Sequence, residues 1–211
     1  MAEYELTCFD KSGNAYKAAL MLELTRSDWQ PRLVDFFHGE TRGEDYRAFN
    51  VMGEAPVLFH GDTVLSQSGV ILDYLTETTG KFGPETSAER REIWRWILFD
   101  NHKLTSYTAT LRFMRGIAKT GETPVTEFLD KRARNAWSVL DRQLVTNDFV
   151  IGPRPTIADL SLCGYLFFDG EHGIDMADYP AMAAWRERIR ALPGWKHPYD
   201  LMPAAPLPEK F

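Results

Sequence analysis

Two short stretches of the chain carry residues suited to holding a peptide-like ligand. In the first, Gly53-Glu54-Ala55-Pro56-Val57-Leu58, the proline stands at the mouth of a short buried strand. Proline has no N–H for a sheet ladder and therefore suits the first residue of a strand. If the Ala55-Pro56 bond is cis, the fold holds it for a purpose. A bent backbone at Ala55 can then offer its N–H and C=O to an extended ligand.

The second stretch, Gln67-Ser68-Gly69-Val70-Ile71-Leu72-Asp73-Tyr74-Leu75, places two polar residues at the start of an amphipathic helix. The free N–H groups of a helix start, together with a hydroxyl, can hold a carboxylate. Gln67 and Ser68 therefore complement Ala55, and the two stretches describe a peptide-shaped pocket.

The elements that must position these residues alternate between strand and helix in the first third of the chain. Short apolar runs and the turn signals around them predict strands at residues 4–9, 31–36, 57–59 and 63–65, the last two joined by a Gly61-Asp62 hairpin turn. Helical spacing predicts helices at 14–26, 44–50 and 66–79.

A Gly- and Pro-rich stretch at 80–86 then reads as a linker, and the strand signals stop after it. Ser87 is predicted to cap a long helix over 88–117, and further helices are expected at 124–145, from 156 onward and at 181–192. Thr156 and Asp159 form a capping box with Asp in place of the usual Glu or Gln. We therefore predict an α/β domain at 1–79 and an all-helical domain at 87–211, which includes a Pro-rich tail.

Composition and charge argue against several classes of function. The chain has 211 residues and a net charge of -6, which argues against a nucleic-acid partner, whose binding proteins are usually basic. We expect no membrane span, because no apolar run is long enough, and no secretory signal, because the N-terminus lacks a basic start. The two cysteines, Cys8 and Cys163, show no motif spacing and indicate buried thiols in a reduced, cytoplasmic protein.

These motifs, in this order, resemble the soluble glutathione transferase family over the whole chain. Asn50 to Leu58 is similar to the family's Asn-Pro-x-Gly-x-Val-Pro-x-Leu, Gln67 to Leu75 to its Glu-Ser-x-Ala-Ile-x-x-Tyr-Leu, and Thr156 to Asp159 to its Ser-x-Ala-Asp helix start. Val51, Ala55 and Gln67 depart from the usual Pro, Val and Glu. The resemblance implies a thioredoxin-like N-terminal domain that binds glutathione, and an all-α C-terminal domain that contributes a site for an electrophile.

The resemblance, to bacterial-like members with a serine-type loop, also implies which residues activate the thiol of glutathione. Ser12 lies between the first strand and the first helix, where such members carry their thiol-contacting residue. Helix N-termini lower the pKa of a thiol, and a hydroxyl can donate to the thiolate. Asn14 can donate through its amide. Either residue can instead cap the helix, so both the catalytic and the capping reading stay open.

The rest of the glutathione site follows by matching positions. Ala55, which Pro56 follows, is expected to pair its backbone with the cysteinyl unit, antiparallel, as an added strand would. Gln67 and Ser68 are expected to hold the γ-glutamyl end. His38 is a candidate for the glycyl carboxylate, with Arg42 and Lys11 as alternatives and an exposed loop histidine as the other reading. Asp100 is a candidate contact to the γ-glutamyl amine held by a partner subunit or, alternatively, a side chain with a solvated or capping-type role.

The electrophile site is expected to take residues from both domains. Candidates are Phe9, Tyr107, Leu111 and Met114, although an aromatic and Met stripe is more often part of a core. Arg112 and Arg115 hint at an anionic acceptor, but charges on a long helix are usually solvated.

Three functions remain open at this point. The first is a cytoplasmic glutathione transferase, a homodimer active in detoxification, which attacks a hydrophobic electrophile with glutathione as co-substrate and no metal. The second is a glutathione-dependent isomerase or peroxidase on the same scaffold. The third is a non-enzymatic binding protein that has kept the fold. A serine rather than a cysteine at position 12 disfavours glutathione-disulfide exchange.

Overall fold

The strand signals of the first third combine into one four-stranded mixed sheet. In the computed structural model, which describes residues 2–211, its strands are β1 (Tyr4–Cys8), β2 (Trp29–Leu33), β3 (Val57–His60) and β4 (Thr63–Ser66). Their spatial order is β2-β1-β3-β4. β1 is parallel to β2 and antiparallel to β3, and β3 and β4 form the predicted hairpin. A parallel pair needs a crossover connection, which a helix supplies here.

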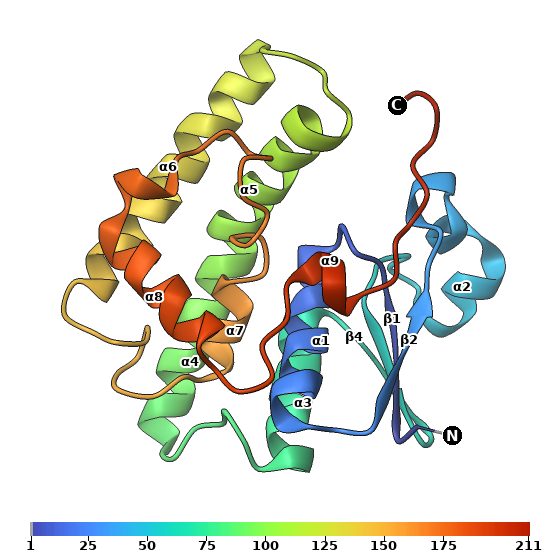
Figure 1. Ribbon diagram of the computed structural model, residues 1–211. Coiled ribbons are helices and arrows are strands. Elements are labelled where there is room, and N and C mark those ends of the chain that lie inside the picture. The colour runs from blue at the N-terminus through green and yellow to red at the C-terminus, as the bar shows by residue number, and fades with distance from the viewer. Residues whose placement is uncertain (1) are drawn as a thin grey trace. The chain divides into compact units, whose positions relative to one another are not determined.

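That crossover is α1 (Gly13–Thr25), which packs beside α3 (Ser68–Thr79) on one face of the sheet, while α2 (Glu44–Phe49) lies beyond the other face (Figure 1). α1 is apolar on nearly all sides, and a helix of that kind has to be buried. Ala18, Leu20 and Met21 are accordingly fully buried. Two single 3-10 turns, η1 (Phe36–His38) and η2 (Glu40–Arg42), lead from β2 into α2.

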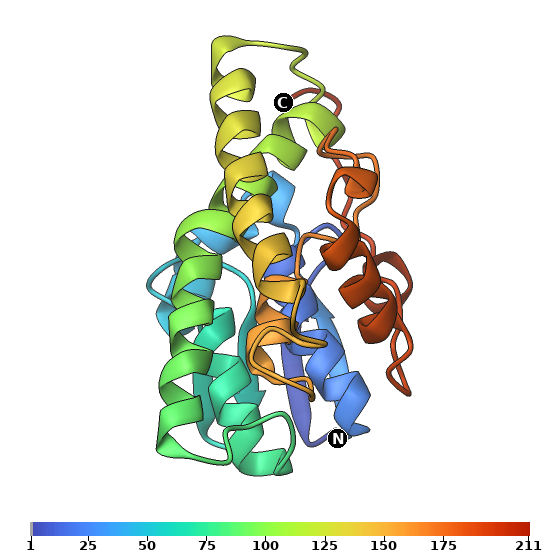
Figure 2. The ribbon, with the colours of Figure 1, turned by 90° about the vertical axis from the view of Figure 1, so that its left-hand side faces the viewer.

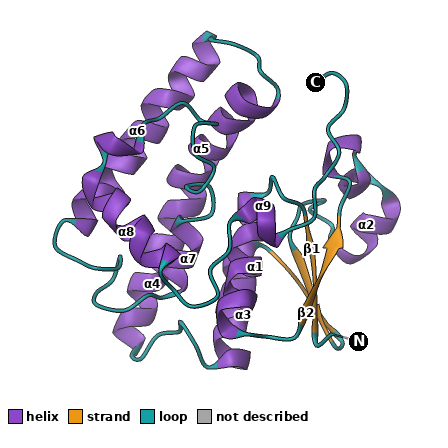
Figure 3. Cartoon of the chain, viewed as in Figure 1, coloured by secondary structure: helices purple, strands orange, loops and turns teal. Residues whose placement is uncertain are grey.

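The second part of the chain is helical. It contains α4 (Ser87–Phe99), α5 (Thr105–Arg112), α6 (Pro124–Leu144), α7 (Ile157–Leu162), the 3-10 turn η5 (Met176–Asp178) and α8 (Pro180–Arg190). Figure 2 shows α4 continuing into α5, with α6 alongside α5. Among the described residues 2–211, all four named strands belong to the first part of the chain (Figure 3).

The long helix predicted over 88–117 is interrupted twice. A π-helical turn, η3 (Asp100–Leu104), joins α4 to α5, and a second, η4 (Phe113–Ile117), follows α5. Each π turn widens the helix locally, a feature that a 3.6-residue periodicity does not reveal. The helix cap also differs from the prediction, because Thr86 rather than Ser87 accepts the Glu89 N–H at 3.1 Å.

The capping box at α7 is confirmed. The Thr156 N–H donates to the Asp159 carboxylate at 2.9 Å, and the Thr156 hydroxyl accepts an N–H at the helix start. Asp159 is fully buried and also accepts from the Trp185 indole at 2.9 Å. Burial raises the pKa of its carboxyl group, and these donors oppose that shift.

The chain divides into two units, residues 1–83 with 193–211, and residues 84–192. The Pro-rich tail therefore belongs with the sheet unit, whereas the sequence prediction placed it in the helical domain. It contains one short helix, α9 (Pro198–Leu201), which contacts α1. Within residues 2–211, no helix combines the length and the apolar character needed to cross a bilayer.

Candidate functional site

The strand register brings the predicted glutathione-binding residues to one end of the sheet. Val57 pairs with Ser66, so Ala55 enters β3 and Gln67 leaves β4 at the same end. β1 is antiparallel to β3, so β1 ends where β3 begins. The turn that leads from β1 to Ser12 therefore lies at the same end of the sheet. Residues far apart in sequence, such as Ser12 and Gln67, are therefore brought to one end of the sheet by the strand pairing.

Ser12 is the N-cap of α1. Its hydroxyl oxygen accepts the Ala15 N–H at 3.1 Å, and its own N–H donates to the Phe9 carbonyl at 3.0 Å. The capping reading is thus confirmed. A hydroxyl that accepts one bond still carries its own proton, so the cap is compatible with donation to a thiolate. Ser12 is only 5% exposed, which fixes its position. Asn14 is the second residue of α1 and is partly buried.

The backbone around Ala55 is held by three side chains that sequence reasoning missed. The Glu54 carbonyl accepts from the Tyr46 hydroxyl at 2.9 Å and from the Asn50 amide at 2.7 Å. Thr7, on β1, accepts the Val57 N–H at 2.6 Å and contacts the Tyr46 hydroxyl at 3.2 Å. The Ala55-Pro56 bond is cis. Sequence signals for this support were the polar Thr7 in a mostly buried strand and Asn50 at the start of the Asn50–Leu58 motif.

Gln67 adopts a positive φ of 70°, which is uncommon outside glycine and recurs at functional sites. Its side-chain amide donates to the Glu54 carboxylate at 2.8 Å and contacts the Met52 sulfur at 3.0 Å. Ser68 is the first residue of α3 and is buried. The exposed Glu54 is therefore a further polar group at this end of the sheet. It lies within the sequence motif but was not predicted as a site residue.

His38 lies in η1, where its Nδ1 is 2.7 Å from the Asp35 carboxylate, and its side chain is about half exposed. η1 follows β2, and the Val34 N–H donates to the Cys8 carbonyl, so this turn also leaves the sheet near the end of β1. Cys8 itself is buried, and burial raises the pKa of its thiol to about 12. That thiol stays protonated near neutral pH, in line with its predicted structural role.

The candidates for the electrophile site have different surroundings. Phe9 is buried in the sheet unit and stacks on Phe36 at a ring-centroid distance of 5.0 Å. In the helical unit, Leu111 is completely buried, while Tyr107 and Met114 are partly exposed. Leu111 thus behaves as a core residue.

Two arginines that hinted at an anionic acceptor are engaged with carboxylates instead. Arg112 is 1% exposed, pairs with Glu171 at 2.9 Å and lies 3.6 Å over the Phe168 ring. Arg115 pairs with Glu122 and Asp130. The expectation of solvated charges is wrong for Arg112, because its partners come from the 167–173 loop, far along the chain.

Asp100 is also buried rather than solvated. Its carboxylate accepts from Thr105 at 2.7 Å and from Ser161 at 2.6 Å, both within the helical unit. These bonds tie the first π turn to α7, and the predicted contact to a partner subunit stays a prediction.

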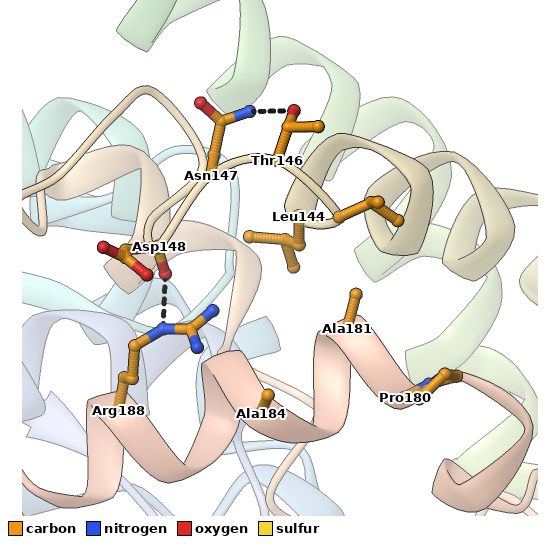
Figure 4. A pocket seen from close by; sticks show the side chains of 9 residues that line it. Leu144, Thr146, Asn147, Asp148, Pro180, Ala181, Ala184 and Arg188 are labelled. Carbon is orange, nitrogen blue, oxygen red and sulfur yellow. Dashed lines mark hydrogen bonds between the residues drawn. The ribbon is translucent and has the colours of Figure 1, made fainter.

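None of the predicted site residues lines either of two surface hollows. One, in the sheet unit, is lined by Arg32, Tyr46, Phe49 and the acidic start of α2. The other lies between the end of α6 and α8 (Figure 4), where the Arg188 guanidinium donates to the Asp148 carbonyl at 2.7 Å. That contact anchors the loop after α6, and we assign the hollow no role in the candidate site.

Comparisons with known proteins match both parts of the chain to one family. The model of the glutathione S-transferase N-terminal domain matches residues 12–78, and that of the C-terminal domain matches residues 103–193. A solved glutathione S-transferase from Pseudomonas fluorescens is 31% identical, with a TM-score of 0.87, covering 92% of this chain and 98% of that one. 

Curated relatives carry more than one activity in their names. The maleylacetoacetate isomerase of Rhizobium meliloti is 27% identical over 198 residues, covering 89% of this chain and 92% of the relative. The disulfide-bond oxidoreductase YfcG of Escherichia coli is 26% identical over 192 residues, covering 88% and 89%. The likeness therefore extends over nearly the whole chain but spans several reactions.

Proposed function

The chain belongs to the glutathione S-transferase family, and from that premise we propose that it binds glutathione at the end of its sheet and activates the thiol for attack on a hydrophobic electrophile. The observation that carries the proposal is the convergence of Ser12, Ala55 and the Gln67-Ser68 pair at that end. One tripeptide can then meet the Ser12 hydroxyl, the backbone of Ala55 and a helix start together.

Ser12 is proposed to stabilise the thiolate. Its hydroxyl oxygen already accepts from Ala15, so its own proton can be donated to another acceptor, for which we propose the glutathione sulfur. The N-terminus of α1 adds a positive potential, which lowers the pKa of a nearby thiol. Asn14 is the proposed second donor. No step transfers the Ser12 proton, since the residue acts by hydrogen bonding alone.

The remaining residues are proposed to hold the tripeptide. Ala55 pairs its backbone with the cysteinyl unit, with Pro56 fixing the chain direction, and Ser68 receives the γ-glutamyl carboxylate at the start of α3. Gln67 contacts the same end of the ligand, and His38 is proposed for the glycyl carboxylate. Orienting both substrates then contributes to the rate alongside thiolate stabilisation.

Retention on immobilised glutathione and turnover of a chlorodinitrobenzene-type substrate test this proposal. We expect both, together with a bound thiol whose pKa lies below that of free glutathione. Retention without turnover of any compound in an electrophile panel would contradict the transferase activity, and absence of glutathione binding would contradict the site as a whole.

A glutathione-dependent isomerase is the second candidate function, because one relative that matches along most of its length is a maleylacetoacetate isomerase. Isomerisation of a maleylacetoacetate-like substrate faster than conjugation would favour it, and reduction of hydroperoxides would favour a peroxidase. A non-enzymatic binding protein predicts retention on glutathione with none of these reactions.

We further propose a homodimer that acts in the cytoplasm, in detoxification. Light scattering coupled to size-exclusion chromatography tests the first part, and a mass equal to one chain at micromolar concentration would contradict it.

A further inference from the structure

The segment after α8 returns to the sheet unit and follows α1 toward the end of β1 (Figure 1). Two contacts fix its first part. The Tyr16 hydroxyl of α1 donates to the Lys196 carbonyl at 2.8 Å, and the Lys196 ammonium pairs with Glu23 at 2.6 Å. The chain then passes through α9 and reaches the turn between β1 and α1.

At that turn, residues 10 and 11 bind residues 203 and 205 of the tail, and we call this set of bonds the Asp10 clasp. The Asp10 N–H donates to the Pro203 carbonyl at 2.8 Å, and the Asp10 carboxylate accepts the Ala205 N–H at 3.0 Å. The Lys11 ammonium pairs with the Asp10 carboxylate at 2.8 Å and donates to the Ala205 carbonyl at 3.3 Å. Asp10 is 5% exposed.

The Asp10 clasp lies inside the turn that sets the position of Ser12. The Ser12 N–H bonds back to the Phe9 carbonyl, so Asp10 and Lys11 are the two residues that this bond encloses. On the tail side, Ala205 is buried in one apolar cluster with Phe9 and Val57. The turn is therefore held from one side by β1 and from the other by the tail.

We propose that Asp10 is a positioning residue for thiol activation, and that tail residues 203–205 are the fixed partner against which it holds the Ser12 loop. The inference rests on the proposed function. A buried carboxylate is costly unless it is paired and hydrogen-bonded, and here all of its recorded partners belong to the turn or the tail. Small displacements of a group that stabilises a reacting atom lower rates strongly.

Positioning by Asp10 and simple electrostatics predict opposite changes in the pKa of the bound glutathione thiol. Removing a negative charge near a thiolate should lower the pKa of the thiol. Loosening the Ser12 loop should instead raise it, because the hydrogen bond to the thiolate is lost. The two effects oppose each other in Asp10→Ala, and only the electrostatic effect operates in Asp10→Asn, whose side-chain oxygen can still accept the Ala205 N–H.

The experiment is an ultraviolet titration of the glutathione thiolate bound to the full-length protein, with kcat and KM for the same variants. For Asp10→Ala we expect a raised thiol pKa and a kcat lower by roughly ten- to a hundredfold, with a nearly unchanged KM for glutathione. Asp10→Asn should retain most of kcat. Asp62→Asn, an exposed carboxylate in the hairpin turn, is the control. A lower thiol pKa in Asp10→Ala, or equal losses in both Asp10 variants, would overturn the inference.

The tail side gives an independent test that leaves Asp10 in place. Ala205→Pro removes the N–H that the carboxylate accepts, and Ala204→Pro makes the same change one residue earlier, at an exposed position. We expect Ala205→Pro, and not Ala204→Pro, to raise the thiol pKa, and we expect its effect not to add to that of Asp10→Ala. Additive effects, or equal effects of the two proline variants, would count against the clasp.

The proposed function and the proposed role of the Asp10 clasp can be refuted independently. If the unmodified protein does not bind glutathione or does not lower the pKa of its thiol, the proposed function fails. If it does both, and the Asp10 and Ala205 variants titrate like the unmodified protein, only the Asp10 clasp is refuted. Thermal unfolding of each variant identifies a loss that comes from reduced stability, since such a loss leaves the thiol pKa of the folded fraction unchanged.

Discussion

The Gln67 side-chain amide donates to the Glu54 carboxylate at 2.8 Å, which links the start of α3 to the residue just before Ala55. The two residues belong to separate motifs and meet because Val57 pairs with Ser66. The γ-glutamyl end of glutathione carries both an ammonium and a carboxylate. If glutathione binds as we propose, the Glu54 carboxylate would face the ammonium and the helix start at Ser68 would face the carboxylate.

Gln67→Ala is expected to raise the KM for glutathione about tenfold, since a hydrogen bond to a charged group contributes about 1.5–3 kcal/mol. The kcat should change less, because the contact is made equally in the ground state and the transition state. Steady-state kinetics at saturating electrophile measure both constants. A large fall in kcat with an unchanged KM would contradict a binding role.

Glu54→Gln removes the charge while keeping a side chain that can meet Gln67. If the carboxylate attracts the γ-glutamyl ammonium, KM for glutathione rises several-fold at low salt, and the effect shrinks as salt screens the pair. Glu44→Gln, an exposed carboxylate at the start of α2, is the matched control. Equal KM values for both variants would remove Glu54 from the site.

Ser12→Ala is expected to lower kcat/KM about a hundredfold, the size typical of losing one donor to a developing or stabilised anion. The same change removes the α1 cap and costs about 1 kcal/mol of stability. Ser12→Gly removes the hydroxyl donor but costs the cap only about a few tenths of a kcal/mol, so it separates the two effects. If Ser12→Ala retains activity and Asn14→Ala loses it, the main donor is Asn14.

Acid is expected to destabilise the helical unit through His172. This ring is 1% exposed, and its Nδ1 accepts the Ile174 N–H at 3.1 Å. Burial lowers its pKa from 6.5 to about 4, with Asp169 opposing and Arg186 and Arg112 reinforcing the shift. The unfolded chain therefore binds the proton more readily, so stability is retained above pH 6.5 and falls as the pH drops toward 4. The loss between pH 7 and pH 5 is about 2 kcal/mol.

Urea unfolding at a series of pH values measures how the free energy of unfolding changes with pH. His172→Asn keeps an acceptor for the Ile174 N–H and removes the titrating group, so its stability should depend less on pH over this range. If the free energy of unfolding of His172→Asn changed with pH as much as that of the unmodified protein, other groups would dominate acid unfolding.

The sequence predicted the sheet unit more closely than the helical one, and the reason is the range of the interactions. Strand, turn and cap signals are local, so β1, the hairpin and the Thr156-Asp159 box were found within a residue or two. β2 was placed two residues late because Pro31 lies within it rather than at its start.

Features that depend on distant partners were missed. A periodicity of 3.6 residues continues through 88–117 and cannot reveal the π turns, whose Asp100 is held by Ser161. Arg112 looks solvated until Glu171 is brought beside it. In the candidate site, motif matching named Gln67 but not Glu54. No local signal pairs Asp10 with Ala205, since 195 positions separate them.

The division of the chain has a consequence for the order in which it matures. The sheet unit is made of the first 83 residues and of residues 193–211, which leave the ribosome only after the whole helical unit. During synthesis the place of Ala205 beside Phe9 stays unfilled, and the carboxylate of Asp10 has no tail to bind. A nascent chain halted within α8 would therefore carry the motif residues without the tail contacts that we propose to position Ser12.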